Sequence, residues 1–245
     1  MQAAYALLMS AAAGVPNPGF YQPIPETNSL TVDLASIQQV VPPFQAAAHD
    51  EIRWGLSSHY SPADPVSLRI RYDRIRASWS DGAIEQGSGD MELGSAGRLL
   101  AVKGVELWMD WVVKLPNADN TTRLGTDETD FTSSAMVRYA TDAWWAQASF
   151  GLAILGNPLM FANQDDAAVL YASAGGPLGP LVWHARGGGR LVSAKNPPWM
   201  LAAAGLGYDS TWFIAGAEGG VGLTPAAPSW QAVIWFGTHV PHLGG

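Results

Sequence analysis

Charged side chains occur at every second position in several short segments of this chain. Arg69 and Arg71 alternate with apolar residues, and Glu106, Asp110 and Lys114 share one face of another segment. Acidic and basic groups on neighbouring strands can pair when they share a face. If that face lines a pore, the same groups can also select solutes by charge. We therefore expect either a bracing network of ion pairs or a selectivity surface.

Four carboxylates gather in the segment from Asn117 to Asp130, namely Asp119, Asp127, Glu128 and Asp130. Clustered carboxylates can bind Ca²⁺. Their spacing is not that of an EF-hand loop. We interpret the segment as a solvated acidic loop and predict no metal site.

The histidines are scattered and match no catalytic motif; they include His59, His184, His239 and His242. The sequence has no H-E-x-x-H, G-x-S-x-G or phosphate-binding loop motif. A serine near His184 could imitate a hydrolase dyad, but such sets are recognised by geometry rather than by sequence. We expect no enzymatic activity and no cofactor.

The composition narrows the classes of partner. The 245 residues are 48% hydrophobic but only 14% charged, with a net charge of -8 and no Cys. Binding of nucleic acid depends on clustered Lys and Arg that neutralise phosphates, so an acidic chain predicts no nucleic-acid partner. Disulfides and cysteine-based zinc sites are excluded because Cys is absent.

The elements that position the charges show the two-residue period of β-strands. Apolar residues share one face of 105–115 and oppose the charged ones, and segments 52–60 and 68–72 repeat the pattern. After residue 72 the parity flips, because Ile75, Ala77 and Trp79 oppose two arginines. We predict a β-bulge near Asp73 to explain the flip.

Twelve such segments predict an all-β fold. We expect strands near 29–40, 50–60, 66–79, 88–101, 104–115, 131–140, 143–155, 167–174, 179–188, 198–208, 211–223 and 229–239. Long and short connections alternate between them, as in an up-and-down barrel of the outer membrane. No stretch has the roughly 18 apolar residues of a spanning helix. We predict a single antiparallel transmembrane β-barrel over residues 29–240, located in the bacterial outer membrane.

Short tails are expected at both ends of the barrel. Residues 1–28 begin with an Ala-rich apolar stretch in which Ala11 and Ala13 are placed like a signal-peptide cleavage site. We interpret this region as a signal remnant or an extended tail. Residues 241–245 are predicted to form a short C-terminal tail.

The face opposite the apolar one should point into the barrel, because a charge facing lipid costs about 2–4 kcal/mol near the midplane. The predicted lumen-lining residues, with a role in binding or selectivity, are Arg53, Arg69, Arg71, Glu92, Arg98, Glu106, Asp110, Lys114, Arg138, His184, Arg186, Trp212 and Trp235. Few charges follow residue 190, so one wall should be polar and the other apolar. An apolar wall favours an apolar or aromatic solute, or packing against a plug.

Tryptophan is abundant, with 11 residues, and its amphipathic ring favours membrane–water interfaces. We expect interfacial anchors at strand ends or on the apolar face, namely Trp54, Trp79, Trp144, Trp183, Trp199 and Trp230. Ordinary core packing is the alternative.

Three motifs carry a resemblance to a known family. They are Gly87–Gly94 with its Gly-Asp pair, Lys114-Leu-Pro116, and Leu124–Phe131. In this order the segments resemble the outer-membrane family named for the meta-pathway of phenol degradation, a group of transporters. The resemblance covers residues 87–155. It implies an outer-membrane β-barrel that passes hydrophobic compounds.

The chain departs from that family at three places. Asn117 and Ala118 stand where the family has Thr-Gly, and Asp127 stands where it has Gly. Many such barrels end in an aromatic residue, whereas this sequence ends His242–Gly245.

Together these features predict a passive channel or uptake protein for small, hydrophobic or aromatic molecules, with membrane lipid as its other partner. Two alternatives stay open. One is a structural or adhesive barrel with a closed lumen, and the other is a soluble lipid-binding β-barrel or sandwich.

Overall fold

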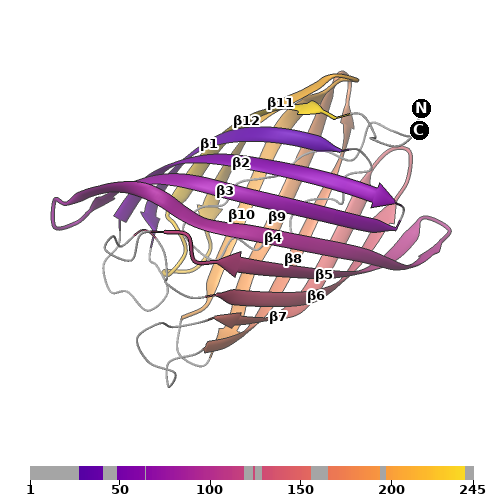
Figure 1. The fold of residues 1–245 in the computed structure, drawn as a ribbon. Helices are drawn as coiled ribbons and strands as arrows, with labels where there is room; N and C mark the ends of the chain where they lie inside the picture. The colour runs from indigo at the N-terminus through magenta and orange to yellow at the C-terminus, as the bar shows by residue number, and fades with distance from the viewer. Residues whose placement is uncertain are drawn as a thin grey trace.

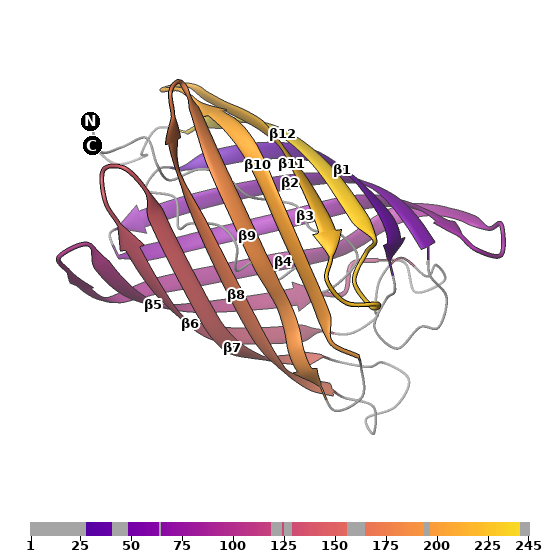
Figure 2. The same ribbon diagram turned by 180° about the vertical axis from the view of Figure 1, so that it is seen from behind.

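Twelve β-strands close into one antiparallel barrel (Figures 1 and 2), which confirms the predicted fold class. The computed structural model describes residues 28–40, 49–63, 65–118, 124, 129–155, 165–193 and 197–240. No helix in these ranges is long and apolar enough to cross a membrane. Apart from Asn28, the two predicted tails and the proposed cleavage site lie outside the described residues.

The strands follow one another around the barrel in chain order. They are β1 (Ser29–Val40), β2 (His49–Ala63), β3 (Val66–Trp79), β4 (Ile84–Val102), β5 (Val105–Leu115), β6 (Asp130–Ala140), β7 (Trp145–Leu155), β8 (Asp165–Leu178), β9 (Leu181–Ser193), β10 (Trp199–Asp209), β11 (Phe213–Gly222) and β12 (Trp230–His239). Each pairs with its neighbours, and β1 pairs with β12 from Ser29–His239 to Gln38–Trp230. Closure therefore leaves no open sheet edge.

The connections separate the barrel into two rims. The longer connections, at 41–48, 80–83, 116–129, 156–164, 194–198 and 223–229, lie at one end, which we call the long-loop rim. The shorter ones, at 64–65, 103–104, 141–144, 179–180 and 210–212, lie at the other end, the short-turn rim. Ser29 and His239 also lie at the short-turn rim. The predicted alternation of connection lengths is confirmed.

Four strands are clearly longer than the sequence predicted, namely β2, β4, β8 and β9, and two of these extend at the long-loop rim. β4 begins at Ile84 rather than near residue 88, and β9 ends at Ser193 rather than near residue 188. Both extensions run toward the long-loop rim. At the first, Gln86 pairs with Arg76, so glycines and polar residues that resemble a loop continue the ladder. Figure 1 shows the β3–β4 hairpin projecting beyond its neighbours at this rim.

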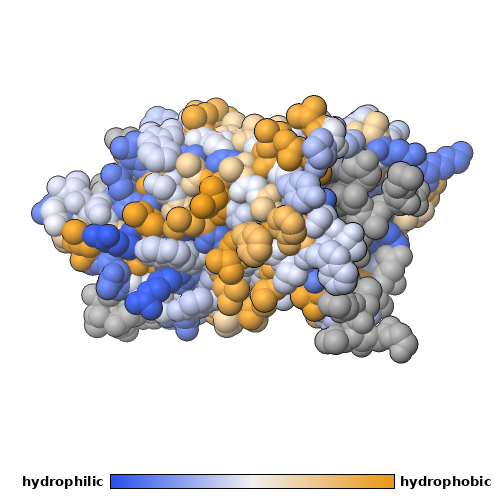
Figure 3. Space-filling view, turned by 90° about the horizontal axis from the view of Figure 1, so that it is seen from above, coloured by the Kyte–Doolittle hydropathy of each residue, from blue (hydrophilic) through white to orange (hydrophobic). Residues whose placement is uncertain are grey.

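Side chains alternate between an apolar outer face and a mixed inner face. Outward residues such as Leu56 (47% exposed) and Leu152 (61%) are exposed on the outer face, whereas inward charged residues such as Asp33 (2%) are buried. Figure 3 shows hydrophobic residues over the middle of the outer face and hydrophilic patches toward the long-loop end. This arrangement is typical of a barrel that meets lipid on the outside.

The predicted flip of parity within 66–79 is wrong. β3 alternates without interruption, so Ile75, Ala77 and Trp79 point inward and Arg74 and Arg76 point outward. The expected bulge exists, but its extra residue lies on β4, where the pairing with β3 shifts between Tyr72 and Arg74. Arg74 and Arg76 therefore lie on the outer face, and Ile75, Ala77 and Trp79 on the inner face, opposite to the prediction.

Candidate functional site

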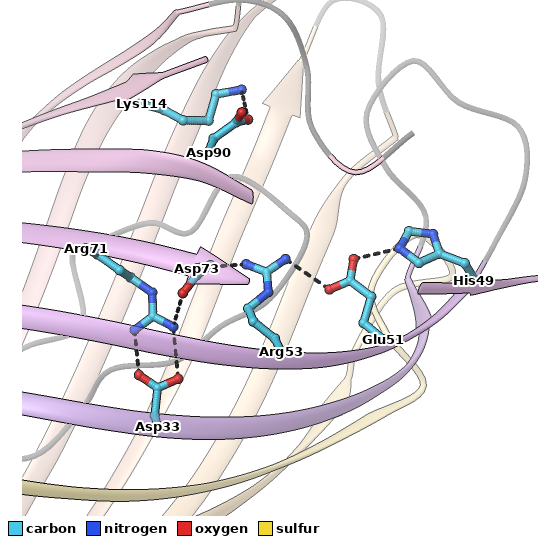
Figure 4. A network of polar contacts seen from close by, with 8 residues as sticks. All are labelled: Asp33, His49, Glu51, Arg53, Arg71, Asp73, Asp90 and Lys114. Atoms are coloured by element: carbon cyan, nitrogen blue, oxygen red, sulfur yellow. Dashed lines mark hydrogen bonds and ion pairs between the residues drawn. The ribbon is translucent and has the colours of Figure 1, made fainter. Parts of the chain in front are cut away.

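The inner wall of β1–β3 carries a continuous network of ion pairs (Figure 4). Arg71 binds Asp33 through two parallel contacts, Nη1–Oδ2 of 2.8 Å and Nη2–Oδ1 of 3.0 Å. Its Nη2 also lies 2.7 Å from Oδ1 of Asp73. Since both carboxylates and the guanidinium group are buried, each charge depends on the others for compensation.

The network continues toward the long-loop rim. Arg53 donates to Oδ2 of Asp73 at 3.0 Å and to Oε2 of Glu51 at 2.9 Å. Nε2 of His49 lies 2.6 Å from Oε1 of Glu51, and its ring stacks at 4.2 Å from that of Trp79. Six side chains from three strands thus form one chain of contacts along the wall (Figure 4).

A second pair lies further around the wall, where Arg69 crosses β4 to reach β5. Its Nη2 donates to both carboxylate oxygens of Asp110 at 2.9 Å. The side chain passes over Gly94, where an added Cβ would lie 2.3 Å from Nε of Arg69. The glycine therefore provides the space in which the arginine lies along the wall.

Glu106 holds two arginines near the short-turn rim. Its Oε1 accepts from Arg98 at 2.9 Å and its Oε2 from Arg138 at 3.0 Å, while the indole of Trp108 donates to Oε2 at 3.1 Å. The guanidinium carbon of Arg98 also lies 5.6 Å from the centre of the Trp108 ring. This cluster spans β4, β5 and β6.

Lys114 joins two of the sequence motifs at the long-loop rim. Its Nζ lies 3.2 Å from Oδ2 of Asp90 and 2.8 Å from Oδ2 of Asp130. Oδ1 of Asp90 also accepts from the backbone amides of Asn117 and Ala118, both at 3.4 Å. The lysine thus links the bulge of β4 to the start of β6.

Leu124, from the third motif, packs in a buried cluster with Ile75, Ala77 and Trp79 of β3. It lies against Gly87, where an added Cβ would be 3.2 Å from a Leu124 methyl group. The loop residue therefore folds back onto the inner wall. Described residues of all three motifs therefore lie in one region at the long-loop rim.

A polar cluster on the opposite wall surrounds Glu218 of β11. Arg186 donates to Glu218 through Nε at 2.9 Å and Nη2 at 2.6 Å, and Nε2 of His184 lies 3.2 Å from Oε2. Gln231 donates to Oε1 at 3.2 Å. His184 reaches Glu218 over Gly205 of β10, where a Cβ would lie 2.5 Å from the imidazole ring.

Glu92 differs from the other predicted lumen-lining charges in its lack of a hydrogen-bonded or ion-paired partner among the described residues. It lies on the inward side of β4, paired in register with Arg71. No hydrogen bond or ion pair joins its carboxylate to another residue within the described ranges. The predicted contacts between the basic strand and the acidic strands therefore form at Asp110 but not at Glu92.

Apolar side chains line much of the lumen next to the long-loop rim, beside the polar groups of His49, Glu51, Lys114 and Asp130. We call this set the apolar collar; it comprises Ile37, Ile75, Ala77, Trp79, Leu124, Ala153, Leu155, Ala167, Val169, Trp199, Leu201, Ala226, Ala227 and Val233. Every member is at most 8% exposed. The collar extends onto both walls, so the predicted division into one polar and one apolar wall is only partly right.

Three tryptophan predictions are wrong. Trp212, predicted inside, lies in the turn between β10 and β11 and is 77% exposed. Trp79 and Trp199, predicted as interfacial anchors, point inward and are 4% and 2% exposed. A strand end determines the position of a residue along the barrel axis, whereas the two-residue alternation of the strand determines whether it faces inward or outward. The predictions for Trp79 and Trp199 considered only the strand end and were therefore wrong about the face.

The remaining predicted positions agree with the structure in their placement. Trp235 is 5% exposed on the inner face, with its ring centre 5.6 Å from that of His184 and the two planes tilted by 52°, and the predicted Arg, Lys, Glu and Asp residues all point inward. Sequence reasoning missed Asp33, Glu51 and Asp73 as partners of the inward arginines. It interpreted Asp130 as part of a solvated loop, which is wrong, because Asp130 is 8% exposed at the start of β6 and pairs with Lys114, as Asp90 does. Asp33 had a usable signal, since it alternates with Val32 and Leu34 in a clear strand.

The described residues contain no group of three His, Asp or Glu side chains that could hold a metal ion. One serine–histidine contact exists, with Oγ of Ser67 lying 2.9 Å from Nε2 of His59. Nδ1 of His59 has no hydrogen-bond partner among these residues. The third group that orients the base in a hydrolase triad is therefore missing from the described part of the site.

A closed twelve-stranded barrel with an apolar exterior and a charged, paired interior defines the class of outer-membrane β-barrel folds. An outer membrane channel from Pseudomonas putida F1 matches with a TM-score of 0.68 over 91% of this chain and 99% of that one, at 12% identity. The NanC porin matches at 0.58 (87% and 99% covered, 6% identity) and the KdgM porin at 0.55 (86% and 98%, 8%). No family model matches the chain, and no curated protein matches it significantly.

Proposed function

We propose that the chain is a passive channel of the bacterial outer membrane for small hydrophobic or aromatic molecules. The observation that carries the proposal is the apolar collar, which lies at the end of the lumen that the long loops surround. In outer-membrane barrels the longer loops are extracellular, so an entering solute would meet the collar first. The family resemblance of the three motifs supports the same substrate class.

The charged networks extend from the middle of the lumen to the long-loop rim, and their charges are largely paired. Nearly every inward arginine is bound to a carboxylate and lies along the wall rather than across the lumen, as Arg69 does over Gly94. A wall of compensated charges attracts neither anions nor cations strongly. The chain's own residues would therefore admit neutral solutes without a charged binding step, and no catalytic step is included in the proposal.

Liposome swelling with matched neutral solutes tests this function. Phenyl glucoside and methyl glucoside are both excluded by lipid and differ in their aromatic ring. We expect proteoliposomes to pass phenyl glucoside at least as fast as the smaller methyl glucoside. A strict preference for the smaller solute would contradict the aromatic substrate class while leaving a channel in place.

The collar itself is tested by Val169→Thr, which replaces an inward methyl by a hydroxyl of similar size. We expect slower flux of phenyl glucoside and unchanged flux of methyl glucoside. The matched control is Val221→Thr, because Val221 is 52% exposed on the outer face. Equal effects of the two substitutions on the flux of phenyl glucoside would show that the collar does not determine this flux.

A second candidate function, a closed structural barrel, is favoured by the buried network around Asp33. Its charges are fully paired, and such pairing can brace a barrel without any transport. Proteoliposomes with no conductance and no solute leakage, from protein that is shown to be folded, would favour this alternative. The third possibility, a soluble carrier, conflicts with the wide apolar outer face.

A further inference from the structure

The outer face carries very few charges. In the strands that the structure describes, four charged side chains point outward, namely Asp50, Arg74, Arg76 and Asp166. All four lie in the half of their strand next to the long-loop rim. A charge that faces hydrocarbon is costly, so these positions indicate a level at which the outer face leaves the hydrocarbon.

Arg74 and Arg76 lie at the upper edge of the apolar belt. On β3 the outward residues below them, up to Tyr72, are apolar or aromatic. Trp54 is paired in register with Arg74 and is 45% exposed. Aromatic side chains of this kind mark the membrane–water interface.

The length of the strands supports this level. A transmembrane strand needs about 9–11 residues, whereas β2, β3 and β4 have 15, 14 and 19. The hairpin that carries the two arginines therefore extends past the hydrocarbon on the long-loop side (Figure 1). Its outward side chains would lie among lipid headgroups if the barrel has the membrane location proposed above.

The two arginines differ from those inside the barrel. Arg53, Arg69 and Arg71 each bind at least one carboxylate. By contrast, no hydrogen bond or ion pair joins Arg74 or Arg76 to any residue that the structure describes. Each guanidinium group has five N–H donors and suits phosphate geometry. The donors therefore lie on the outer face with no acceptor among the described residues.

A groove on the outer face is lined in part by Arg76 and could accommodate a bound group. It has a volume of about 310 Å³ and is lined on the outer face by Ser36, Gln38, Asp50, Ser78 and Trp230, among others. The indole of Trp230 donates to the side chain of Gln38, which fixes that edge of the groove. Asp50 is the outward carboxylate of this groove and is paired in register with Ser78, so an anion would bind at the side of Arg76 that faces Arg74.

We propose that Arg74 and Arg76 bind the phosphate group of a lipid in the outer leaflet. The guanidinium groups supply charge-assisted hydrogen bonds to the phosphate. The neighbouring Trp54 and Ile52 contact the upper part of the lipid chains. The site is separate from the lumen, so it acts on the position of the barrel in the membrane and not on the solute.

Native mass spectrometry of the detergent-solubilised barrel tests this site, with diphosphoryl and monophosphoryl lipid A as probes. We expect the double variant Arg74→Gln/Arg76→Gln to bind the diphosphoryl lipid about tenfold more weakly than the parent protein. The variant Arg74→Lys/Arg76→Lys keeps the charge and should retain most of the affinity. Both side chains are exposed, and a heat-dependent gel shift verifies that each variant is folded.

The matched control is Lys103→Gln, which removes an exposed positive charge at the short-turn rim and should leave binding unchanged. Equal affinity of the parent and the glutamine variant, or an equal loss in the control, would overturn the site. Displacement of the lipid by the same concentration of inorganic phosphate would show a site for free anions and overturn the lipid assignment. Solute flux is measured separately, so the failure of either proposal leaves the other standing.

Discussion

Arg71 reaches across a whole strand to bind Asp33, and it does so by lying on Gly55. Gly55 is paired in register with Asp33 on one side and Asp73 on the other. A Cβ at this position would lie 2.2 Å from Nη2 of Arg71 and 2.6 Å from both carboxylate oxygens of Asp33. Gly94 under Arg69 and Gly205 under His184 repeat the arrangement.

The first prediction concerns this glycine. Gly55→Ala should destabilise the barrel by about 2–4 kcal/mol, because it separates a buried bidentate pair and leaves both charges poorly compensated. Urea unfolding of the refolded barrel in lipid vesicles measures the change. Gly219→Ala serves as the control, since a Cβ there meets no atom within 4 Å. Equal stability of the two variants would show that Arg71 finds another arrangement at little cost.

The second prediction concerns the cluster around Glu218. Glu218→Gln should cost about 3–5 kcal/mol, because Arg186 then stays buried without its carboxylate. The double variant Arg186→Met/Glu218→Leu removes both charges together and should be clearly more stable than the single variant. The same unfolding assay compares them. A double variant as unstable as the single one would mean that packing, and not charge, dominates this site.

The third prediction concerns the turn between β4 and β5. Lys103 has a φ of 49° and Gly104 a φ of 82°, as in the type I′ turns of two-residue hairpins. Gly104→Ala should lower stability by about 1–2 kcal/mol, since its Cβ would also lie 2.8 Å from the carbonyl oxygen of Ala140. Lys103→Asn should raise stability by about 0.5 kcal/mol, because Asn tolerates this backbone region better. A stabilising Gly104→Ala or a destabilising Lys103→Asn in the unfolding assay would contradict the turn geometry.

The fourth prediction concerns the two faces of the barrel. Trp54, Trp144 and Trp230 are 40–45% exposed, whereas Trp145 and Trp235 are 2% and 5% exposed. In vesicles that contain brominated lipid, replacing the three exposed tryptophans by Phe should remove much of the quenching of fluorescence. Replacing Trp145 and Trp235 by Phe should leave the quenching unchanged. A loss in the second variant would place lipid inside the lumen.

The sequence predicted the strands well because a two-sided strand leaves a strong period. Leu56 and Arg53 differ in chemistry as their environments do, so the face of β2 followed directly. The period failed on β3, where Ile75, Ala77 and Trp79 are apolar and yet point inward. Near the long-loop rim apolar residues occur on both faces of the sheet. The polarity of a residue there does not predict whether its side chain points inward or outward.

The partners of the charges were harder to predict than their positions. The pairing of Arg71 with Asp33 depends on a glycine in a third strand, and no local pattern encodes such a relation. Lys114 was predicted to face the lumen, but its contact with Asp90 follows from the bulge in β4. That bulge was assigned to the wrong strand, because alternation alone does not say which of two paired strands holds the extra residue.

The pairing of β1 with β12 has a consequence for the order of assembly. Ser29 and His239 are neighbours in the closed sheet but lie at opposite ends of the described sequence. The ring can therefore close only after the last strand has been made, and contacts between such distant residues form slowly. Until then β1 and β12 each present unpaired backbone groups, which hydrocarbon does not tolerate. Insertion and closure must therefore proceed together, as one cooperative step.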